Sequence, residues 1–339
     1  MGRIISRLLS VLAVFVISTA ISHAQTVLSA SSFLPATNLH TQDTLIAWGA
    51  DVERVTQGRV KINLLPKPAV APAGTFDAVK EGLVDVAWTL HGLTAARFVL
   101  ANLAEFPATG TTGEQTSVAY QRIYDQYLAK AGEHKGVKVL AVFTHSPGQL
   151  LMAKRPVNSV EDLVGLKIRV PGGTAVDVAK SLGVVPIMRP VNEVYELLNG
   201  GIVDGVFFPP AAINTMKLEQ LVKYVTIIPG GFYNSSFVMF MNEDRYNKLS
   251  KQDRDAIDSV SGEVISRRIG RSYDAQDKNT MASLPAGIAV TNASPAFVQA
   301  LKAKTAELEA NWIKEANAKG VDGAKVLAAF RAEAQRVAR

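Results

Sequence analysis

Gly-Gly-Ile-Val-Asp-Gly-Val-Phe, residues 200–207, repeats the pattern of Glu-Gly-Leu-Val-Asp-Val-Ala-Trp at residues 81–88. Each stretch follows a short segment with helical periodicity, at 193–199 and 76–80. The pattern predicts a helix, a glycine that ends it in the left-handed conformation, and a strand with an aromatic residue near its end. Helix, glycine and strand follow one another in many α/β proteins, so a generic origin stays open beside the interpretation of two related lobes.

Further strands and helices alternate around these two stretches. Short β-branched or aromatic runs predict strands at 60–65, 84–90, 137–144, 167–170, 184–188, 206–208, 225–228 and 237–241. Apolar residues at helical spacing predict helices at 40–56, 117–131, 250–280, 295–318 and 322–337. The alternation predicts an α/β protein with parallel sheets covered by helices.

The segment 250–280 is the longest predicted helix. If it is continuous, it extends about 45 Å at ~1.5 Å per residue, which exceeds the thickness of one small domain. Gly262 and Gly270 lie inside it, and both are weak helix formers that could mark bends.

Composition excludes several classes of protein. The chain has 339 residues, of which 48% are hydrophobic and 19% charged, so disorder is excluded and a large core is possible. It has no cysteine, which excludes disulfides, thiolate metal sites and cysteine nucleophiles. The net charge is +6, but the basic residues are scattered, so we expect no nucleic-acid partner.

The N-terminus is typical of a secretory signal peptide. Residues 1–7 carry two arginines and no acid, residues 8–21 are almost wholly apolar, and Ser22-His23-Ala24 places small residues at the first and third positions. We expect cleavage near Ala24 and a periplasmic mature protein with a net charge of 6 − 2 = +4. An uncleaved anchor is the alternative, although the apolar run is short of the ~20 residues that span a bilayer.

The usual signatures of catalysis and metal binding are missing from the sequence. His40, His91, His134 and His145 show no metal-ligand spacing. No zinc-protease helix, phosphate-binding loop or nucleophile elbow is present. We therefore expect no cofactor, no metal and no catalytic residue.

The second half of the chain carries the most specific signal. Residues 163–172 read LVGLKIRVPG, residues 192–198 read NEVYELL, and residues 203–205 read VDG. Residues 58–62 (GRVKI) and 82–87 (GLVDVA) add weaker matches. This ordered set resembles the extracytoplasmic solute-binding subunits of tripartite ATP-independent periplasmic (TRAP) transporters, in their dicarboxylate-type (DctP-like) branch.

The resemblance implies a two-lobed periplasmic-binding-protein architecture, with a long helix bracing both lobes and a ligand cleft between them. The expected division is residues 1–24 as signal peptide, 25–146 plus 235–276 as lobe 1, and 147–234 plus 277–339 as lobe 2. It also implies delivery of the ligand to the TRAP membrane permease without turnover. We expect a monomer that closes on its ligand about hinges near 144–149 and 234–237.

By this resemblance, Arg169 is the arginine that binds the ligand's carboxylate. A guanidinium offers paired donors that match both carboxylate oxygens, and it stays charged when it is desolvated. The family usually has asparagine at the position of Phe208, and some of its acidic-sugar binders have arginine near Gln149. These departures favour an apolar or aromatic monocarboxylate or 2-oxo acid over a dicarboxylate.

Other candidates lie near strand ends, where ligands bind in open α/β sheets. They are Phe33, Trp88, His91, Val191, Phe232, Tyr233 and Asn234. A core role for Trp88 is nearly as well supported as ligand stacking. The second polar contact could also have moved to His91, Gln149, Tyr233 or Asn234.

Four functions therefore stay open. The first is a solute-binding protein for an apolar or aromatic carboxylate. The others are a C4-dicarboxylate binder, a sensor subunit that presents its ligand to a membrane receptor, and an enzyme acting on a small carboxylate. An enzyme needs a nucleophile or an acid–base pair near Arg169, and the sequence offers none that we can identify.

Overall fold

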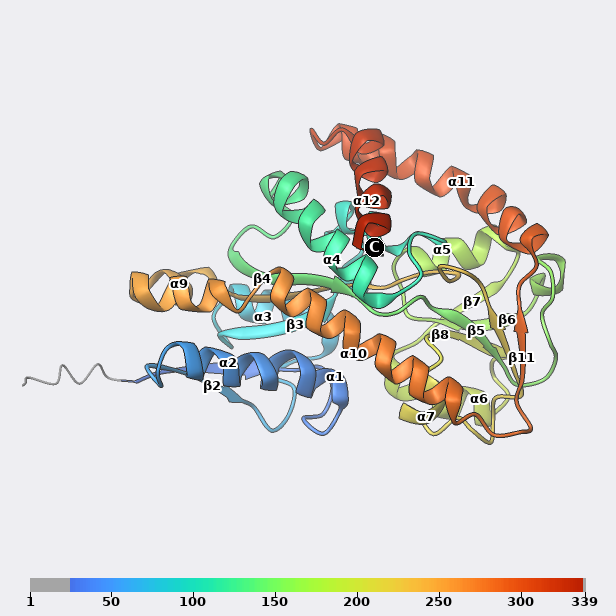
Figure 1. Cartoon of the computed structure of the whole chain (residues 1–339), viewed down its shortest axis with the longest axis horizontal. Coiled ribbons are helices and arrows are strands. Elements are labelled where there is room, and N and C mark those ends of the chain that lie inside the picture. Colours follow the sequence, from blue (N-terminus) through green and yellow to red (C-terminus); the bar gives the residue numbers. More distant parts are fainter. Residues whose placement is uncertain (1–24, 338–339) are drawn as a thin grey trace, which may run out of the picture.

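Two mixed β-sheets frame the protein in the computed structural model, which describes residues 25–337 (Figure 1). The five-stranded sheet has the order β2-β1-β3-β10-β4, and the six-stranded sheet has the order β11-β9-β5-β8-β6-β7. We call the part of the molecule built on the five-stranded sheet lobe 1 and the part built on the six-stranded sheet lobe 2. The signal peptide predicted for residues 1–24 lies outside the described residues.

The predicted strands are present, with small differences in their bounds. Lobe 1 contains β1 (Thr26–Ser31), β2 (Val60–Leu64), β3 (Val86–Leu90), β4 (Val137–Thr144) and β10 (Ser236–Asn242). Lobe 2 contains β5 (Gln149–Met152), β6 (Lys167–Val170), β7 (Val185–Met188), β8 (Gly205–Phe208), β9 (Tyr224–Ile227) and β11 (Ala289–Asn292). The strands predicted from the sequence do not include β1, β5 and β11, and the last two are only four residues long.

The expectation of parallel sheets is wrong for the strands at the lobe crossings. β1 pairs in parallel with β2 and β3, but β10 is antiparallel to both β3 and β4. β5 is likewise antiparallel to β8 and β9. The reason is topological: β5 and β10 each enter their sheet from the other lobe, so they run against the strands that end at the cleft.

The helices cover the outer faces of the sheets. They are α1 (Leu39–Thr41), α2 (Ala47–Val55), α3 (Thr75–Lys80), α4 (Gly113–Ile123), α5 (Thr174–Ser181), α6 (Val194–Asn199), α7 (Ala212–Thr215), α8 (Glu243–Asn247), α9 (Lys251–Ser259), α10 (Glu263–Ala282), α11 (Pro295–Ala318) and α12 (Gly323–Val337). A π-helical segment, Gln42–Ile46, joins α1 to α2, and another, Tyr124–Leu128, extends α4. No helix in residues 25–337 is both long and apolar enough to cross a membrane.

The long helix predicted over 250–280 is interrupted. Gly262 has φ of +61° and separates α9 from α10, so the 20 residues of α10 extend about 30 Å. Gly270 does not interrupt the helix. It lies within α10 where α4 approaches, and a Cβ atom there would lie 2.5 Å from Cα of Glu114. The glycine is required by this close approach of two backbones.

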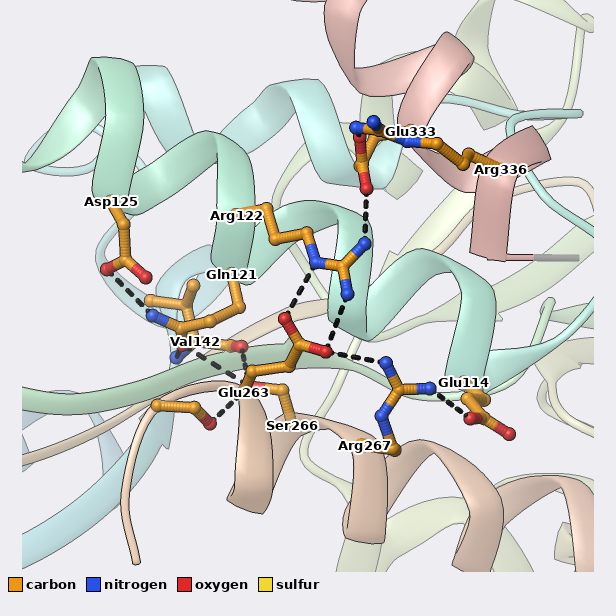
Figure 2. A network of polar contacts seen from close by, with 11 residues as sticks. Glu114, Gln121, Arg122, Asp125, Val142, Glu263, Ser266, Arg267, Glu333 and Arg336 are labelled. Atoms are coloured by element: carbon orange, nitrogen blue, oxygen red, sulfur yellow. Dashed lines mark hydrogen bonds and ion pairs between the residues drawn. The ribbon is translucent and has the colours of Figure 1, made fainter. Parts of the chain in front are cut away.

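α10 braces both lobes, as expected. In Figure 1 it runs diagonally from the five-stranded sheet toward α6 and α7 of lobe 2. Near its C-terminal end, a carboxylate oxygen of Asp277 accepts the backbone N–H of Ala211 in lobe 2 at 2.7 Å. Near its start, Glu263 accepts two hydrogen bonds of 2.7 Å from the guanidinium of Arg122 on α4 (Figure 2).

The same ion network also ties α12 to α4. Arg122 contacts Glu333 on α12 at 2.5 Å, and Arg267 on α10 bonds both Glu263 and Glu114 (Figure 2). The guanidinium of Arg122 therefore joins three helices that are far apart in the sequence. The network fixes α10 to lobe 1 along its first half.

The C-terminal helix packs on lobe 1 rather than lobe 2. Leu327 and Phe330 of α12 are buried in one cluster with Phe76, Tyr120 and other residues of lobe 1. The sequence analysis assigned residues 277–339 to lobe 2. We propose instead that residues 312–337 belong with lobe 1, because their apolar face is covered there. α11 then leads the chain back from lobe 2 to lobe 1 (Figure 1).

Candidate ligand site

A cavity of about 180 Å³ lies between the two lobes. Its wall contains Leu90 at the end of β3, Phe208 at the end of β8, and Pro171 directly after β6. These are carboxyl ends of strands, where ligands bind in open α/β sheets. Most of the lining side chains are aromatic or aliphatic, so the cavity is largely apolar.

Six of the ten predicted site residues lie on the cavity wall. They are Phe33, Trp88, Arg169, Val191, Phe208 and Tyr233. Lobe 1 supplies the first two, lobe 2 supplies the next three, and Tyr233 lies in the segment that returns to lobe 1. The topology thus brings together residues that the sequence separates by up to 200 positions, 233 − 33.

Arg169 places a buried positive charge on this wall. Its side chain is fixed by a hydrogen bond of 3.0 Å from Nε to the carbonyl oxygen of Arg189, and its guanidinium carbon lies 5.1 Å from the ring centroid of Phe208. The residue is 3% exposed and has no ion-pair partner among residues 25–337. Burial lowers the pKa of Arg169 to about 10, so the side chain remains charged at neutral pH.

Aromatic side chains form the wall contributed by lobe 1. The rings of Phe33 and Trp88 lie 4.6 Å apart, and the indole N–H of Trp88 donates to Ser32 Oγ at 3.0 Å. Trp88 also packs in the core against Phe143 and Phe237, which stack on each other. It therefore lines the cavity and fills the core at once, so the two roles weighed for it are compatible.

Tyr233 presents its ring, rather than its hydroxyl group, as the feature that shapes the wall. Its hydroxyl donates to the carbonyl oxygen of Phe207 at 3.1 Å, and the two rings are stacked with centroids 5.5 Å apart. A Cβ atom at Gly148 would lie 2.1 Å from this ring. The glycine thus makes room for Tyr233 beside the crossing segment.

The other four predicted residues lie away from the cavity wall. His91 Nε2 faces His134 Nε2 at 2.9 Å, and Gln149 forms two hydrogen bonds with the backbone of Ile228. Phe232 stacks on Phe207 inside the core of lobe 2, and Asn234 is buried beside the lobe 1 helix α4. The three polar side chains form hydrogen bonds within the protein, and the ring of Phe232 packs in a core, so none of the four faces the cavity.

Sequence reasoning missed His40, His145 and Tyr273, which also line the cavity. His40 stacks on Tyr273 with ring centroids 4.2 Å apart. These residues lie on a helix, on a crossing segment and on α10, so a search of strand ends cannot find them. A better signal is the position of Tyr273 on the buried face of the bracing helix.

Neither histidine adds charge to the cavity at neutral pH. Burial lowers the pKa of His145 to about 3 and that of His40 to about 4. Nδ1 of His145 donates to the carbonyl oxygen of Ser146, and Nε2 accepts the backbone N–H of Ser235 at 3.1 Å. Among the described lining residues, Arg169 is therefore the one formal charge, and no lining residue is acidic.

The described residues show no group of three or more histidine, cysteine, aspartate or glutamate side chains suited to a metal ion. What the cavity offers is one desolvated guanidinium above a phenyl ring, in an enclosure of aromatic and aliphatic groups. Such a site suits a small anion with an apolar body. A two-lobed α/β frame with a cleft of this kind defines a solute-binding protein.

The chain belongs to the DctP family, the bacterial extracellular solute-binding proteins of family 7, whose sequence model matches residues 30–315. This confirms the resemblance to the solute-binding subunits of TRAP transporters. The family is extracytoplasmic, and its members are the substrate-binding components of these transporters.

Similar proteins support the same class. The outer membrane transporter protein TsaT of Comamonas testosteroni is 32% identical over 305 residues, which are 90% of each chain. A TRAP solute-binding protein from Bordetella bronchiseptica, solved with bound (R)- and (S)-mandelate, is 41% identical with a TM-score of 0.88, over 92% of this chain and 99% of that one. Another from Rhodoferax ferrireducens, with copurified benzoate, is 28% identical with a TM-score of 0.85, over 93% and 99%.

Proposed function

We propose that this protein captures a small aromatic monocarboxylate, of the benzoate or mandelate class, between its lobes. The observation that carries the proposal is the buried guanidinium of Arg169, which has no carboxylate partner in the described chain and lies over the ring of Phe208. A desolvated charge without a partner is unfavourable, so a bound carboxylate gains a strong, directional pair. The aromatic wall then accommodates the ring of the ligand.

The similar proteins support this class of ligand. The Bordetella bronchiseptica and Rhodoferax ferrireducens proteins hold mandelate and benzoate, and both molecules combine one carboxylate with one phenyl ring. A dicarboxylate fits this wall poorly, because Arg169 is the one formal charge among the described lining residues. A second carboxylate would be desolvated without a charged donor, which costs several kcal/mol.

We further propose that the protein is an exported monomer that delivers its ligand to a TRAP membrane permease without converting it. The cleavage of residues 1–24 near Ala24 is part of this proposal. An enzyme needs a nucleophile or an acid–base pair beside the ligand, and both ring nitrogens of His145 are already engaged. Permease genes beside this one favour transport, whereas a neighbouring sensor kinase gene favours ligand-dependent signalling.

Calorimetric titration of the mature protein tests the ligand class. The panel contains benzoate, (R)-mandelate, phenylglyoxylate, succinate, malate and benzamide, the last being a neutral analogue of benzoate. We expect the three aromatic acids to bind more tightly than both dicarboxylates, and benzamide to bind far more weakly than benzoate. Tighter binding of succinate than of every aromatic acid contradicts the proposed class. Equal binding of benzamide and benzoate contradicts the role of Arg169.

A further inference from the structure

A buried carboxylate outside the cavity joins the two lobes. Glu105 ends the 3₁₀ segment Leu100–Glu105 of lobe 1 and is 2% exposed. One oxygen accepts the backbone N–H of Ser236 at 3.1 Å and its hydroxyl at 2.7 Å, both at the start of β10. The other oxygen accepts the backbone N–H of Thr174 at 2.9 Å. Thr174 opens α5 of lobe 2, so this bond crosses between the lobes.

Burial raises the pKa of Glu105, and the N–H and hydroxyl groups that donate to its carboxylate oppose this rise. Because Ser236 Oγ donates to Glu105, it accepts from Nδ1–H of His91 at 3.1 Å. Nε2 of His91 is then an acceptor, so the donor in the 2.9 Å contact is Nε2–H of His134. Burial lowers the pKa of both histidines, which keeps them neutral in this arrangement. Every hydrogen bond in the row therefore donates in the direction of the Glu105 carboxylate.

Glycines allow the lobes to approach at this point. A Cβ atom on Gly92 of lobe 1 would lie 2.9 Å from the backbone nitrogen of Gly173 in lobe 2. A Cβ atom on Gly173 would lie 2.5 Å from a carboxylate oxygen of Glu105. Gly173 directly precedes Thr174 and lies four positions after Arg169. The contact between the lobes is thus linked by a short segment to the arginine on the cavity wall.

We propose that Glu105 is a latch between the lobes: its bond to Thr174 N–H forms when the cleft closes, so Glu105 strengthens ligand binding without touching the ligand. Glu105 is in this sense a positioning residue. Ser236 begins β10 of lobe 1, so its bonds to Glu105 stay within that lobe and persist in both the open and the closed state. The bond from Thr174 of lobe 2 requires the closed state. The part of the inference that concerns ligand affinity rests on the proposed function.

Glu105→Gln tests the latch with little change in shape. Ser236 and Thr174 donate to different oxygens of the Glu105 carboxylate, and the amide oxygen of glutamine can replace only one of them. The amide nitrogen then faces the other N–H donor and cannot accept from it. We expect affinity for (R)-mandelate to fall at least about tenfold, mainly through faster dissociation. Glu133→Gln is the matched control, because Glu133 is also a buried carboxylate that accepts a backbone N–H, but its partner Leu100 lies in lobe 1. The control should bind mandelate like the wild type.

Closure can be followed directly, since the chain contains no cysteine. Ala96→Cys in lobe 1 and Lys180→Cys in lobe 2 are exposed positions for a pair of fluorophores. At saturating mandelate, Glu105→Gln should lower the fraction of molecules in the high-transfer, closed state. Glu133→Gln should leave that fraction unchanged even if it lowers the melting temperature.

Gly92→Ala probes the same contact from a different side. The new methyl group meets the backbone of Gly173 only when the lobes approach, so it should weaken mandelate binding severalfold while the ligand-free fold is retained. Gly287→Ala is its control, because a Cβ atom there meets no atom within 4 Å.

Hydrogen exchange in the ligand-free protein tests the latch independently of the ligand, because the cleft also opens and closes without ligand and the Glu105 bond protects the amide of Thr174 whenever the cleft is closed. We expect the amide of Thr174 to exchange measurably faster in Glu105→Gln than in the wild type. If the wild type binds none of the aromatic acids, the proposed function fails, but this measurement still decides on the latch. Unchanged exchange at Thr174 in Glu105→Gln overturns the inference. If the wild type binds mandelate, an equal mandelate affinity of Glu105→Gln overturns it as well.

Discussion

Replacing Arg169 with methionine should separate ligand binding from stability. Methionine keeps an unbranched apolar stem but removes the guanidinium and its bond to the Arg189 carbonyl. A bound carboxylate would lose its charged partner inside a desolvated cavity, and truncating one partner of such a pair costs about 2–5 kcal/mol. At ~1.4 kcal/mol per tenfold change, this is a loss of about 30-fold to several thousand-fold in benzoate affinity.

The stability of the ligand-free protein should change much less. Burial of the unpaired charge lowers the pKa of Arg169 to about 10, which corresponds to a desolvation cost on the order of 3 kcal/mol. Methionine removes this cost, but it also loses one hydrogen bond worth ~1 kcal/mol and the stacking on Phe208 worth ~1–2 kcal/mol. We therefore expect the free energy of unfolding to stay within about 1 kcal/mol of the wild type.

Calorimetric titration with benzoate, together with urea denaturation without ligand, measures both quantities. Arg189→Met is the control, because the side chain of Arg189 is 57% exposed and its interaction with Glu193 lies at the surface. Benzoate affinity within threefold of the wild type in Arg169→Met would refute the assignment of Arg169 as the carboxylate partner. A large parallel loss of stability would show instead that Arg169 supports the fold.

Three further substitutions probe other parts of the molecule. Phe208→Asn should weaken mandelate binding and improve succinate binding in a titration, because an amide donor replaces the phenyl wall; a wild type that prefers succinate, with no change in the variant, contradicts this. Gly270→Ala should lower the free energy of unfolding by about 2 kcal/mol in urea, since its Cβ would lie 2.5 Å from Glu114 Cα, whereas Gly287→Ala should not. Asp277→Asn should remove a gain in stability on acidification: burial raises the pKa of Asp277 to about 6, above the ~3.9 of the unfolded chain, so the folded state takes up the proton first. Wild-type stability relative to the variant should then increase as pH falls from about 6 to 4, by on the order of 2 kcal/mol, and a constant difference across urea titrations at these pH values contradicts the shift.

Much of the fold could be predicted from local sequence patterns. β4 and β6 have the predicted bounds, and α11 spans the predicted 295–318, because β-branched runs and apolar periodicity report local structure well. The strand directions could not be predicted in this way. β5 and β10 are antiparallel because each enters its sheet from the other lobe, and this is a property of the chain path.

Six of the ten predicted residues line the cavity, and two of these six were predicted from two kinds of information. Arg169 and Phe208 end neighbouring strands and also lie within the family motif, and both line the cavity. His91 was predicted because it follows a strand end, and Gln149 because some family members have arginine near that position, but the structure pairs their side chains with His134 and the backbone of Ile228. Whether a buried polar side chain faces the protein or the cavity depends on tertiary partners, which a single sequence does not display.

The packing of α12 on lobe 1 determines the order in which the lobes can be completed. Phe76 and Phe330 share one core although 330 − 76 = 254 positions separate them, and contacts of such long range form slowly. Synthesis proceeds from the N-terminus, so most of lobe 1 emerges from the ribosome before the helix that covers its apolar face. The lobe that is made first is therefore the last that can be finished.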